Sequence, residues 1–208
     1  MKELIKAVER LKSEDISGVI EERMEEFSRF KGAEIEEIFK EMCFCVMTAN
    51  CGAEKCLEVH EGVDAGFLTL SQEKLAAKFK DLGYRFPNIR SKYIVENRKK
   101  LDDLKEILHS NDEGAQLRDW VAKNIKGLGY KESSHFLRNV GFKEYGIVDF
   151  HIADLLEDHG LIEKPKTMTK KKYLEIEVVL KELAQELDLT LAELDLYLWY
   201  LETGKVLK

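Results

Sequence analysis

The chain has 208 residues, of which 44% are hydrophobic and 35% are charged. This composition is typical of a folded globular protein and excludes a disordered or collagen-like chain. The sequence contains no signal peptide and no apolar stretch long enough to span a bilayer. We therefore expect a cytoplasmic protein without a membrane partner.

The formal net charge is −7, which argues weakly against nucleic-acid binding, because phosphate affinity comes mostly from Lys and Arg. The charge is uneven, however. Residues 118–146 contain six basic and three acidic side chains, and residues 164–172 contain five lysines and no acid. A local basic surface on an acidic protein is compatible with DNA binding, so the net charge does not decide the question.

Apolar residues recur every three to four positions along the chain, which is the period of amphipathic helices. This period is present from Leu4 to Leu11 and from Ile16 to Phe30. Further helices are predicted at residues 33–49, 54–62, 71–82, 88–109, 113–126, 130–140, 150–159, 170–187 and 191–203. No segment alternates convincingly like a strand, so the predicted fold is all-α, with one core built as two lobes.

The boundaries of several predicted helices carry recognisable signals. Ser71 is placed to cap its helix, and Thr190 with Glu193 matches a capping box ahead of the last helix. Glycines stand where four helices should stop, at Gly83, Gly141, Gly160 and Gly204.

Four cysteines, Cys43, Cys45, Cys51 and Cys56, fall within fourteen residues. Metal and cluster sites usually contain a tight pair such as Cys-x-x-Cys, and no such pair occurs here. Cys43 continues the apolar stripe of residues 35, 38, 39 and 42, as a buried thiol does. We therefore expect the cysteines to contribute to packing, and we predict no metal and no cofactor.

The most informative stretch is Ile125-Lys126-Gly127-Leu128-Gly129-Tyr130-Lys131, between two predicted helices. Two glycines one residue apart permit a tight turn, and the next helix points its dipole and free N–H groups at the same place. With its apolar flanks, the stretch matches the helix-hairpin-helix pattern hxxhxGhGxxxAxxhh, with Ser133 in place of the alanine. Such hairpins hold DNA phosphates without reading sequence. The alternative is an ordinary tight αα-corner, in which Lys131 is only a solvated lysine.

Asp149 follows Lys131 by eighteen residues and directly precedes a predicted helix, so its simplest role is a helix cap. A lysine in the second helix of the hairpin with an aspartate at about this distance resembles the helix-hairpin-helix DNA glycosylase superfamily. Residues 43–50, residues 129–139 and the ending from Leu196 to Lys208 resemble in particular the archaeal-type 8-oxoguanine DNA glycosylase/AP lyases. The cysteine quartet near the C-terminus that holds an iron–sulfur cluster in other branches of the superfamily is absent.

The resemblance implies that Lys131 and Asp149 form the catalytic pair. A neutral lysine amine attacks C1′ of the deoxyribose, and the carboxylate stabilises the positive charge that develops on the sugar. A lysine nucleophile forms a Schiff base, which permits β-elimination of the 3′ phosphate. The implied enzyme is therefore bifunctional, a glycosylase and an abasic-site lyase.

Other residues receive expected roles near the DNA backbone. Gly127, Gly129, Lys126 and Arg138 are expected to contact phosphates. Phe86 is a candidate wedge that fills the gap left by an extruded base. The alternative for Phe86 is a hydrophobic staple on the following helix.

The resemblance also implies a base pocket built partly from the end of the chain. Trp199 is expected to stack on the target base, and Lys208 to contribute to reading its edge. Without the resemblance, Trp199 reads as a core aromatic and Lys208 as a frayed tail.

By the same resemblance, residues 1–208 form a single glycosylase unit with its active site in the cleft between two lobes. One lobe is expected at about residues 34–148, with the hairpin at 120–140. The other is expected at residues 1–33 plus 149–208.

The expected function is base-excision repair, in which 8-oxoguanine is removed from duplex DNA and the abasic site is cleaved. The expected partner is double-stranded DNA containing 8-oxoguanine or an abasic site, and the protein is expected to act as a monomer at the nucleoid. Two alternatives remain open. One is a non-catalytic helix-hairpin-helix DNA-binding module, and the other is a related glycosylase for another damaged base.

Overall fold

The structure is a computed structural model that describes residues 1–110 and 114–208. In these residues it contains α-helices and short 3-10 helices and no β-strand, which confirms the predicted all-α class. None of the helices in the described part of the chain is long and apolar enough to cross a bilayer. The chain divides into two compact units, which we describe separately.

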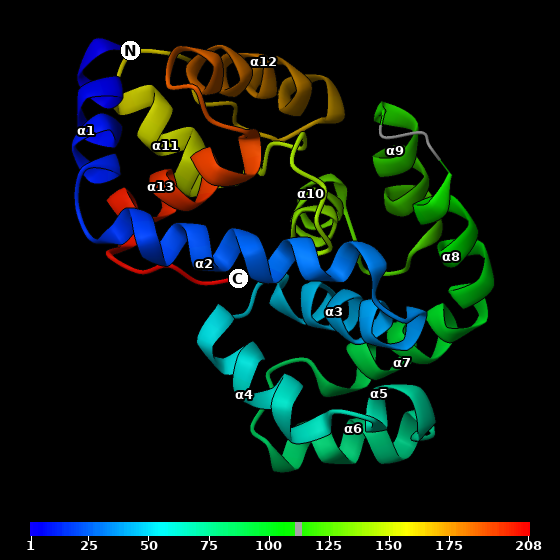
Figure 1. The fold of residues 1–208 in the computed structure, drawn as a ribbon. Helices are drawn as coiled ribbons and strands as arrows, with labels where there is room; N and C mark the ends of the chain where they lie inside the picture. Colours follow the sequence, from blue (N-terminus) through cyan, green and yellow to red (C-terminus); the bar gives the residue numbers. More distant parts are fainter. Residues whose placement is uncertain (111–113) are drawn as a thin grey trace. The chain divides into compact units, whose positions relative to one another are not determined.

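Unit 1 comprises residues 1–31 and 137–208, so it brings the two ends of the chain into one body (Figure 1). Its helices are α1 (Lys2–Lys12), α2 (Ile16–Arg29), α11 (Phe150–Asp158), α12 (Lys170–Glu186) and α13 (Leu191–Thr203). Helix α13 packs against the other four, and the side chains along it are apolar and buried on nearly every side. It is therefore the central helix of this unit.

Unit 2 comprises residues 32–136. Its complete helices are α3 (Ile35–Thr48), α4 (Ala53–Val63), α5 (Gly66–Thr69), α6 (Gln72–Asp81), α7 (Pro87–Asn97), η2 (Arg98–Lys100), α8 (Leu101–His109) and α9 (Ala115–Asn124). Helix α3 packs against α4, α5, α7 and α8, and its residues 42–47 are all fully buried. This stretch forms the core of the unit.

Two helices lie at the boundaries between the units along the chain. The 3-10 helix η1 (Phe30–Gly32) contains the first boundary, and α10 (Tyr130–Asn139) contains the second. The sequence predicted a boundary between the lobes after residue 148, whereas the second segment of unit 1 starts at Leu137. Residues 137–148 join unit 1 because their backbone packs against α2: a Cβ on Gly141 would lie 3.0 Å from the carbonyl oxygen of Phe27.

The predicted caps and stops are confirmed. The Ser71 hydroxyl accepts a hydrogen bond from the Lys74 N–H, and Thr190 with Glu193 forms both bonds of a capping box. The four glycines at predicted helix ends all have positive φ angles.

Two predicted helices differ from those in the structure. The predicted helix at 88–109 is divided by η2 into α7 and α8. The predicted helix at 113–126 is observed as α9, and residue 113 itself lies outside the described residues.

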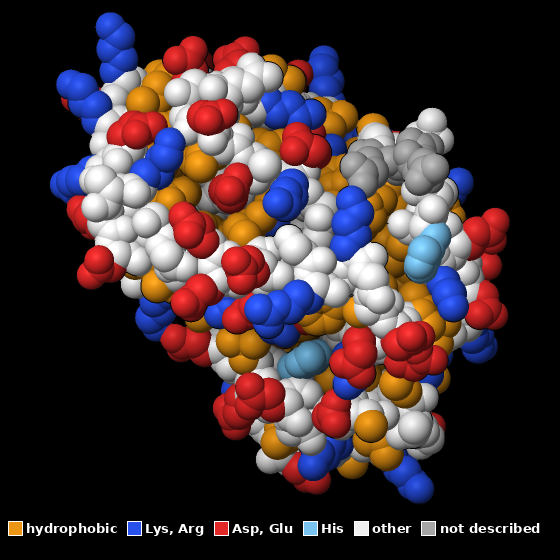
Figure 2. Space-filling view, viewed as in Figure 1, with side chains coloured by type: hydrophobic (Ala, Val, Ile, Leu, Met, Phe, Trp, Pro, Cys, Tyr) orange, Lys and Arg blue, Asp and Glu red, His pale blue; other side chains and the backbone are white. Residues whose placement is uncertain are grey.

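Acidic and basic side chains are interspersed on the face that Figure 2 displays. No extended single-sign surface is visible in that view.

Candidate active site

The turn between α9 and α10 is anchored by two buried apolar residues, Ile125 and Leu128. Gly127 lies between them with a φ of +89°, and a Cβ there would come within 2.8 Å of Cδ2 of Tyr93 and 3.2 Å of Cγ1 of Val46. Only glycine fits this position, because a side chain would be strained both by the backbone angle and by its neighbours.

Gly129 is in a different situation. Its φ is not positive, and the atom nearest to an added Cβ would be Oε2 of Glu132 at 3.1 Å, the end of a flexible side chain. The fold therefore places little demand on this glycine. Its backbone is exposed at the start of α10, where the first N–H groups of a helix have no partner within the helix.

A buried asparagine holds the hairpin from the side. The Nδ2 group of Asn97 donates to the carbonyl oxygen of Lys126 at 2.9 Å, and the Lys126 N–H donates to Oδ1 of Asn97 at 2.8 Å. The carboxamide thus pairs with both backbone groups of one residue, as a strand neighbour would. The role of Asn97 is not evident from the sequence, because the apolar period predicts one long helix through this position.

Lys131 is half-buried in the first turn of α10. The turn beneath it is closed by Ser133, whose hydroxyl and N–H both donate to the carbonyl oxygen of Gly129, at 2.7 and 2.9 Å. Ser133 is completely buried, so the position that the motif reserves for alanine accepts only a small side chain.

Polar groups of α9 fix the residue before Lys131. The Tyr130 hydroxyl donates to Oδ1 of Asp119 at 2.6 Å, and the Arg118 guanidinium lies 4.4 Å from the centre of the Tyr130 ring. Two effects raise the pKa of Tyr130: burial is the larger, and the hydrogen bond to Asp119 is the second. Arg118 also donates to the Ser134 hydroxyl at 3.1 Å, so the two helices of the hairpin share one polar network. None of these contacts was predicted from the sequence.

Phe86 is half-buried and lies directly before Pro87, the first residue of α7. The guanidinium groups of Arg85 and Arg90 lie 5.0 and 5.9 Å from the centre of its ring. Arg90 also donates to the carbonyl oxygen of Ala49 at 3.0 Å. Two guanidinium groups therefore lie next to the Phe86 ring in unit 2.

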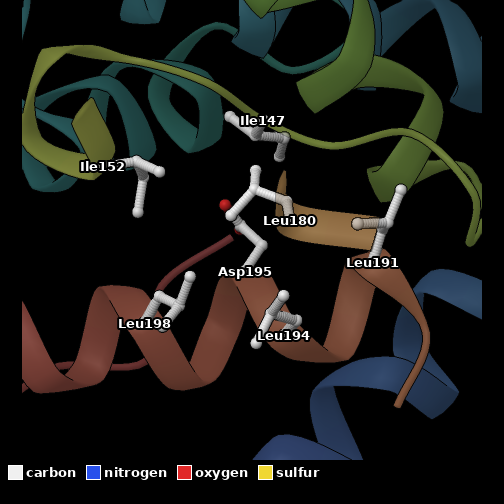
Figure 3. A pocket seen from close by; sticks show the side chains of 7 residues that line it. All are labelled: Ile147, Ile152, Leu180, Leu191, Leu194, Asp195 and Leu198. Carbon is white, nitrogen blue, oxygen red and sulfur yellow. The ribbon is translucent and has the colours of Figure 1, made fainter. Parts of the chain in front are cut away.

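The phosphate contact expected for Arg138 disagrees with the structure. Its side chain is 5% exposed and forms an ion pair with Asp195, and its guanidinium lies over the ring of Phe27 at 4.9 Å. Asp195 is the only charged residue among the seven that line the apolar pocket in Figure 3. Arg138 therefore neutralises a carboxylate that is only 10% exposed within unit 1, which leaves its guanidinium little surface for a phosphate.

Asp149 is the N-cap of α11, as the sequence predicted. Its Oδ1 accepts a hydrogen bond from the Ile152 N–H at 3.0 Å, and its backbone is extended. The cap needs only this one oxygen of the carboxylate. Asp149 is half-buried, so part of the residue is exposed on unit 1.

Aromatic side chains lie at the first turn of α11. Phe150 is 48% exposed and His151 is exposed, and the rings of His151 and the half-buried Trp199 are nearly perpendicular with 5.8 Å between their centres. The ammonium group of Lys164 lies 5.6 Å from the centre of the Phe150 ring. Trp199 is therefore not a fully buried core aromatic. Phe150 and His151 were not predicted as part of this surface.

Lys208 is half-buried at the end of the segment that follows Gly204, the glycine with a φ of +69° that ends α13.

The cysteines behave as packing residues in unit 2. Cys43, Cys45 and Cys56 are buried, Cys51 is part-exposed, and all four are free thiols. Burial raises the pKa of Cys43 and Cys56, which keeps their thiols protonated. Within residues 1–110 and 114–208 no group of three potential ligands gathers in a way that could hold a metal ion.

The predicted site residues are divided between the two units. Unit 2 contains Phe86, the hairpin glycines with Lys126, and Lys131. Unit 1 contains Arg138, Asp149, Trp199 and Lys208.

The chain is similar in sequence and in fold to known 8-oxoguanine DNA glycosylases. The profile of the 8-oxoguanine DNA glycosylase family matches residues 20–189. A protein of Korarchaeum cryptofilum named 8-oxoguanine DNA glycosylase/AP lyase is 50% identical over 207 residues, which cover 99% of this chain and 98% of the relative.

Solved structures are similar over the same extent. The structure of the Methanocaldococcus jannaschii 8-oxoguanine glycosylase/lyase in complex with 15mer DNA containing 8-oxoguanine matches with a TM-score of 0.94 and 46% identity, covering 99% of both chains. The 8-oxoguanine DNA glycosylase of Thermotoga maritima matches with a TM-score of 0.92 and 41% identity, covering 100% of this chain and 99% of that one.

Proposed function

The chain belongs to the 8-oxoguanine DNA glycosylase family, and on that premise we propose that it removes 8-oxoguanine from duplex DNA and cleaves the abasic site that remains. The observation that carries most of this proposal is the hairpin of residues 125–131. It combines an exposed glycine backbone at a helix N-terminus with a half-buried lysine in the first turn of the same helix.

The hairpin binds the DNA backbone. A phosphate fits against the N–H groups of the first turn of α10, because the helix dipole favours an anion there. Gly129 lets the phosphate approach closely, Gly127 shapes the turn, and the exposed Lys126 adds a positive charge. These contacts hold the duplex without reading its sequence while the damaged nucleotide turns out of the stack.

Lys131 is the nucleophile. Its Nζ forms a bond to C1′ as the bond between C1′ and N9 of the base breaks, and the base leaves with a proton. The nitrogen then loses a proton and the sugar ring opens, which gives a Schiff base. The Schiff base acidifies C2′. Loss of a C2′ proton breaks the bond from C3′ to its oxygen and releases the 3′ phosphate.

Asp149 supplies a negative charge for the same reaction. As the glycosidic bond breaks, positive charge develops on the sugar, and a carboxylate held in one orientation stabilises it. The cap bond to Ile152 provides that orientation, so capping and catalysis are compatible in one side chain.

Trp199 and Lys208 contribute to the base pocket. The half-buried Trp199 stacks on the extruded base, and Lys208 takes part in recognising its edge. In unit 2, Phe86 is the wedge that replaces the base in the stack, and the guanidinium groups of Arg85 and Arg90 beside it face the phosphates.

We also propose that the protein acts as a monomer in the cytoplasm, where it associates with the nucleoid, and that its partner is double-stranded DNA with 8-oxoguanine or an abasic site.

Borohydride trapping tests the proposal. The protein is incubated with a duplex that contains 8-oxoguanine opposite cytosine, borohydride is added, and a covalent protein–DNA adduct is expected. Lys131→Gln should abolish the adduct while DNA affinity is largely retained. If the unchanged protein gives no adduct with this duplex or with abasic DNA, the lysine nucleophile is wrong. A retained adduct in Lys131→Gln would place the nucleophile elsewhere.

A further inference from the structure

The segment that leads into Asp149 has an unusual set of hydrogen-bond partners. Residues 145–149 are outside any helix, and Gly146 and Val148 are buried, so their backbone groups need partners within the protein. Two side chains of α12 supply them. Oε1 of Glu177 accepts from the Gly146 N–H at 2.9 Å, and the Tyr173 hydroxyl donates to the Gly146 carbonyl oxygen at 2.6 Å.

The Tyr173 hydroxyl also makes a second bond in the opposite sense. It accepts from the Val148 N–H at 3.1 Å, so one hydroxyl bridges two residues of the segment and uses both its donor and an acceptor position. Tyr173 is 1% exposed and Glu177 is 3% exposed. They are four residues apart and therefore share one face of α12.

The backbone lies close against this face. A Cβ on Gly146 would come within 3.1 Å of Cγ of Glu177 and 3.4 Å of Cδ1 of Leu180, so the missing side chain permits the approach. On the far side of Val148, Asp149 is fixed by its cap bond to the Ile152 N–H. The carboxylate thus follows a backbone that is held immediately before it and immediately after it.

We infer that Tyr173, together with Glu177, is a positioning residue that fixes the carboxylate of Asp149 for the release of the damaged base. The inference rests on the proposed function, in which Asp149 stabilises the positive charge on the sugar. Electrostatic stabilisation depends on the orientation of the charged group, and a small displacement of that group slows the reaction. A residue that only supports the fold would change stability without acting through Asp149.

Tyr173→Phe is the direct test, because it removes only the hydroxyl and leaves the Gly146 carbonyl and the Val148 N–H without their partner. The measurement is the single-turnover rate of base release from a duplex with 8-oxoguanine opposite cytosine, at saturating protein. We expect the rate to fall about tenfold or more. Leu183→Ala is the matched control, because Leu183 is a fully buried residue of the same helix without polar side-chain atoms. It lowers stability through packing and should leave the rate near that of the unchanged protein.

A double-mutant cycle separates positioning from support of the fold. If Tyr173 acts through Asp149, Tyr173→Phe should slow base release in the unchanged protein but have less than about a twofold effect when Asp149 is already asparagine. An equal loss in both backgrounds would overturn the inference, and so would a rate for Tyr173→Phe that matches Leu183→Ala.

The outcomes also separate this inference from the proposed function. A slow Asp149→Asn with a fast Tyr173→Phe refutes the inference alone. A fast Asp149→Asn refutes the proposed role of Asp149, and the inference with it. Borohydride trapping on abasic DNA reports independently on Lys131.

Glu177 offers a second route if Tyr173→Phe does not fold. Glu177→Ala removes the acceptor for the Gly146 N–H, whereas Glu177→Gln keeps an acceptor oxygen at the same place. We expect the alanine variant to slow base release and the glutamine variant to recover most of the rate. Equal rates for the alanine variant and the unchanged protein would contradict the inference.

Discussion

The two glycines of the hairpin make different contributions, which a pair of alanine variants can separate. Gly127→Ala puts a side chain at a φ of +89° and against the Tyr93 ring, so we expect a loss of about 1–3 kcal/mol in the free energy of unfolding. Gly129→Ala meets only the flexible end of Glu132, and its effect should stay within about 0.5 kcal/mol. Chemical denaturation measures both.

Gly129→Ala, which should hardly change stability, should have a clear effect on DNA binding. In the proposed complex a Cβ on Gly129 would stand between the phosphate and the backbone, so Gly129→Ala should weaken binding to a duplex with a stable abasic-site analogue by about tenfold. Fluorescence anisotropy measures the Kd. Unchanged affinity in a folded Gly129→Ala would mean that the phosphate does not bind at the start of α10.

Asp149 can lose its charge without losing its cap. Asparagine is as good an N-cap as aspartate, so Asp149→Asn should keep the bond to the Ile152 N–H and change stability by no more than about 0.5 kcal/mol. The neutral amide cannot stabilise a cationic sugar, and base release in a single turnover should slow by about 100-fold or more. A near-normal rate would reduce Asp149 to a helix cap.

At the scale of elements, the hairpin depends on the break between α7 and α8. Asn97 is the last residue of α7, and its carboxamide pairs with both backbone groups of Lys126. Asn97→Leu preserves the volume but leaves two backbone groups without partners. We expect a loss of about 1–3 kcal/mol in the free energy of unfolding. We also expect weaker DNA binding, because the turn proposed to bind the phosphate is no longer held.

Ser91→Ala is the matched control for Asn97. Ser91 is a fully buried polar residue of the same helix, and its hydroxyl donates to the carbonyl oxygen of Asn88, within α7. Its removal should lower stability without changing the Kd. If both variants weaken DNA binding in proportion to their loss of stability, Asn97 has no specific role in the hairpin.

The same break shows where prediction from sequence ends. The apolar period continues through residues 88–109, so a single helix was predicted. In the structure Arg98 donates to the carbonyl oxygens of Phe67 and Leu70, both at 2.6 Å, and burial lowers its pKa. These partners are about thirty residues away along the chain, and no local pattern encodes them. Caps such as Ser71 and Asp149 were predictable because their partners lie three residues away.

The residues of the candidate site also differ in whether a local pattern could identify them. Gly127 and Lys131 belong to the hairpin stretch, and Asp149 lies at about the distance that the family resemblance implies, so all three could be named from the sequence. Arg138 lies on the second helix of the hairpin, and the sequence predicted that it contacts a phosphate. Its partner Asp195 lies 57 residues further along the chain, and only the folded unit shows that the two form a buried ion pair.

At the scale of the whole molecule, the distribution of charge predicts how the DNA affinity depends on salt. Residues 118–146 contain six basic side chains, but Arg118 and Arg138 are buried and engaged within the protein. The face in Figure 2 shows acids interspersed with bases. A protein with net charge −7 and few free lysines around its hairpin makes few phosphate contacts, so its affinity should depend on salt less steeply than that of a strongly basic DNA-binding protein.

The salt dependence can be assigned to the hairpin. Each phosphate contact contributes about 0.9 to the slope of log Kd against log salt concentration, so we expect a slope of about 2–4. Lys126→Ala should lower the slope by about 1, equally for damaged and undamaged duplexes, because a phosphate contact carries no base specificity. Lys78→Ala removes the same charge from an exposed position of α6 and should leave the slope unchanged. If Lys126→Ala leaves the slope unchanged as well, the charge that attracts DNA lies elsewhere and the hairpin binds through its backbone alone.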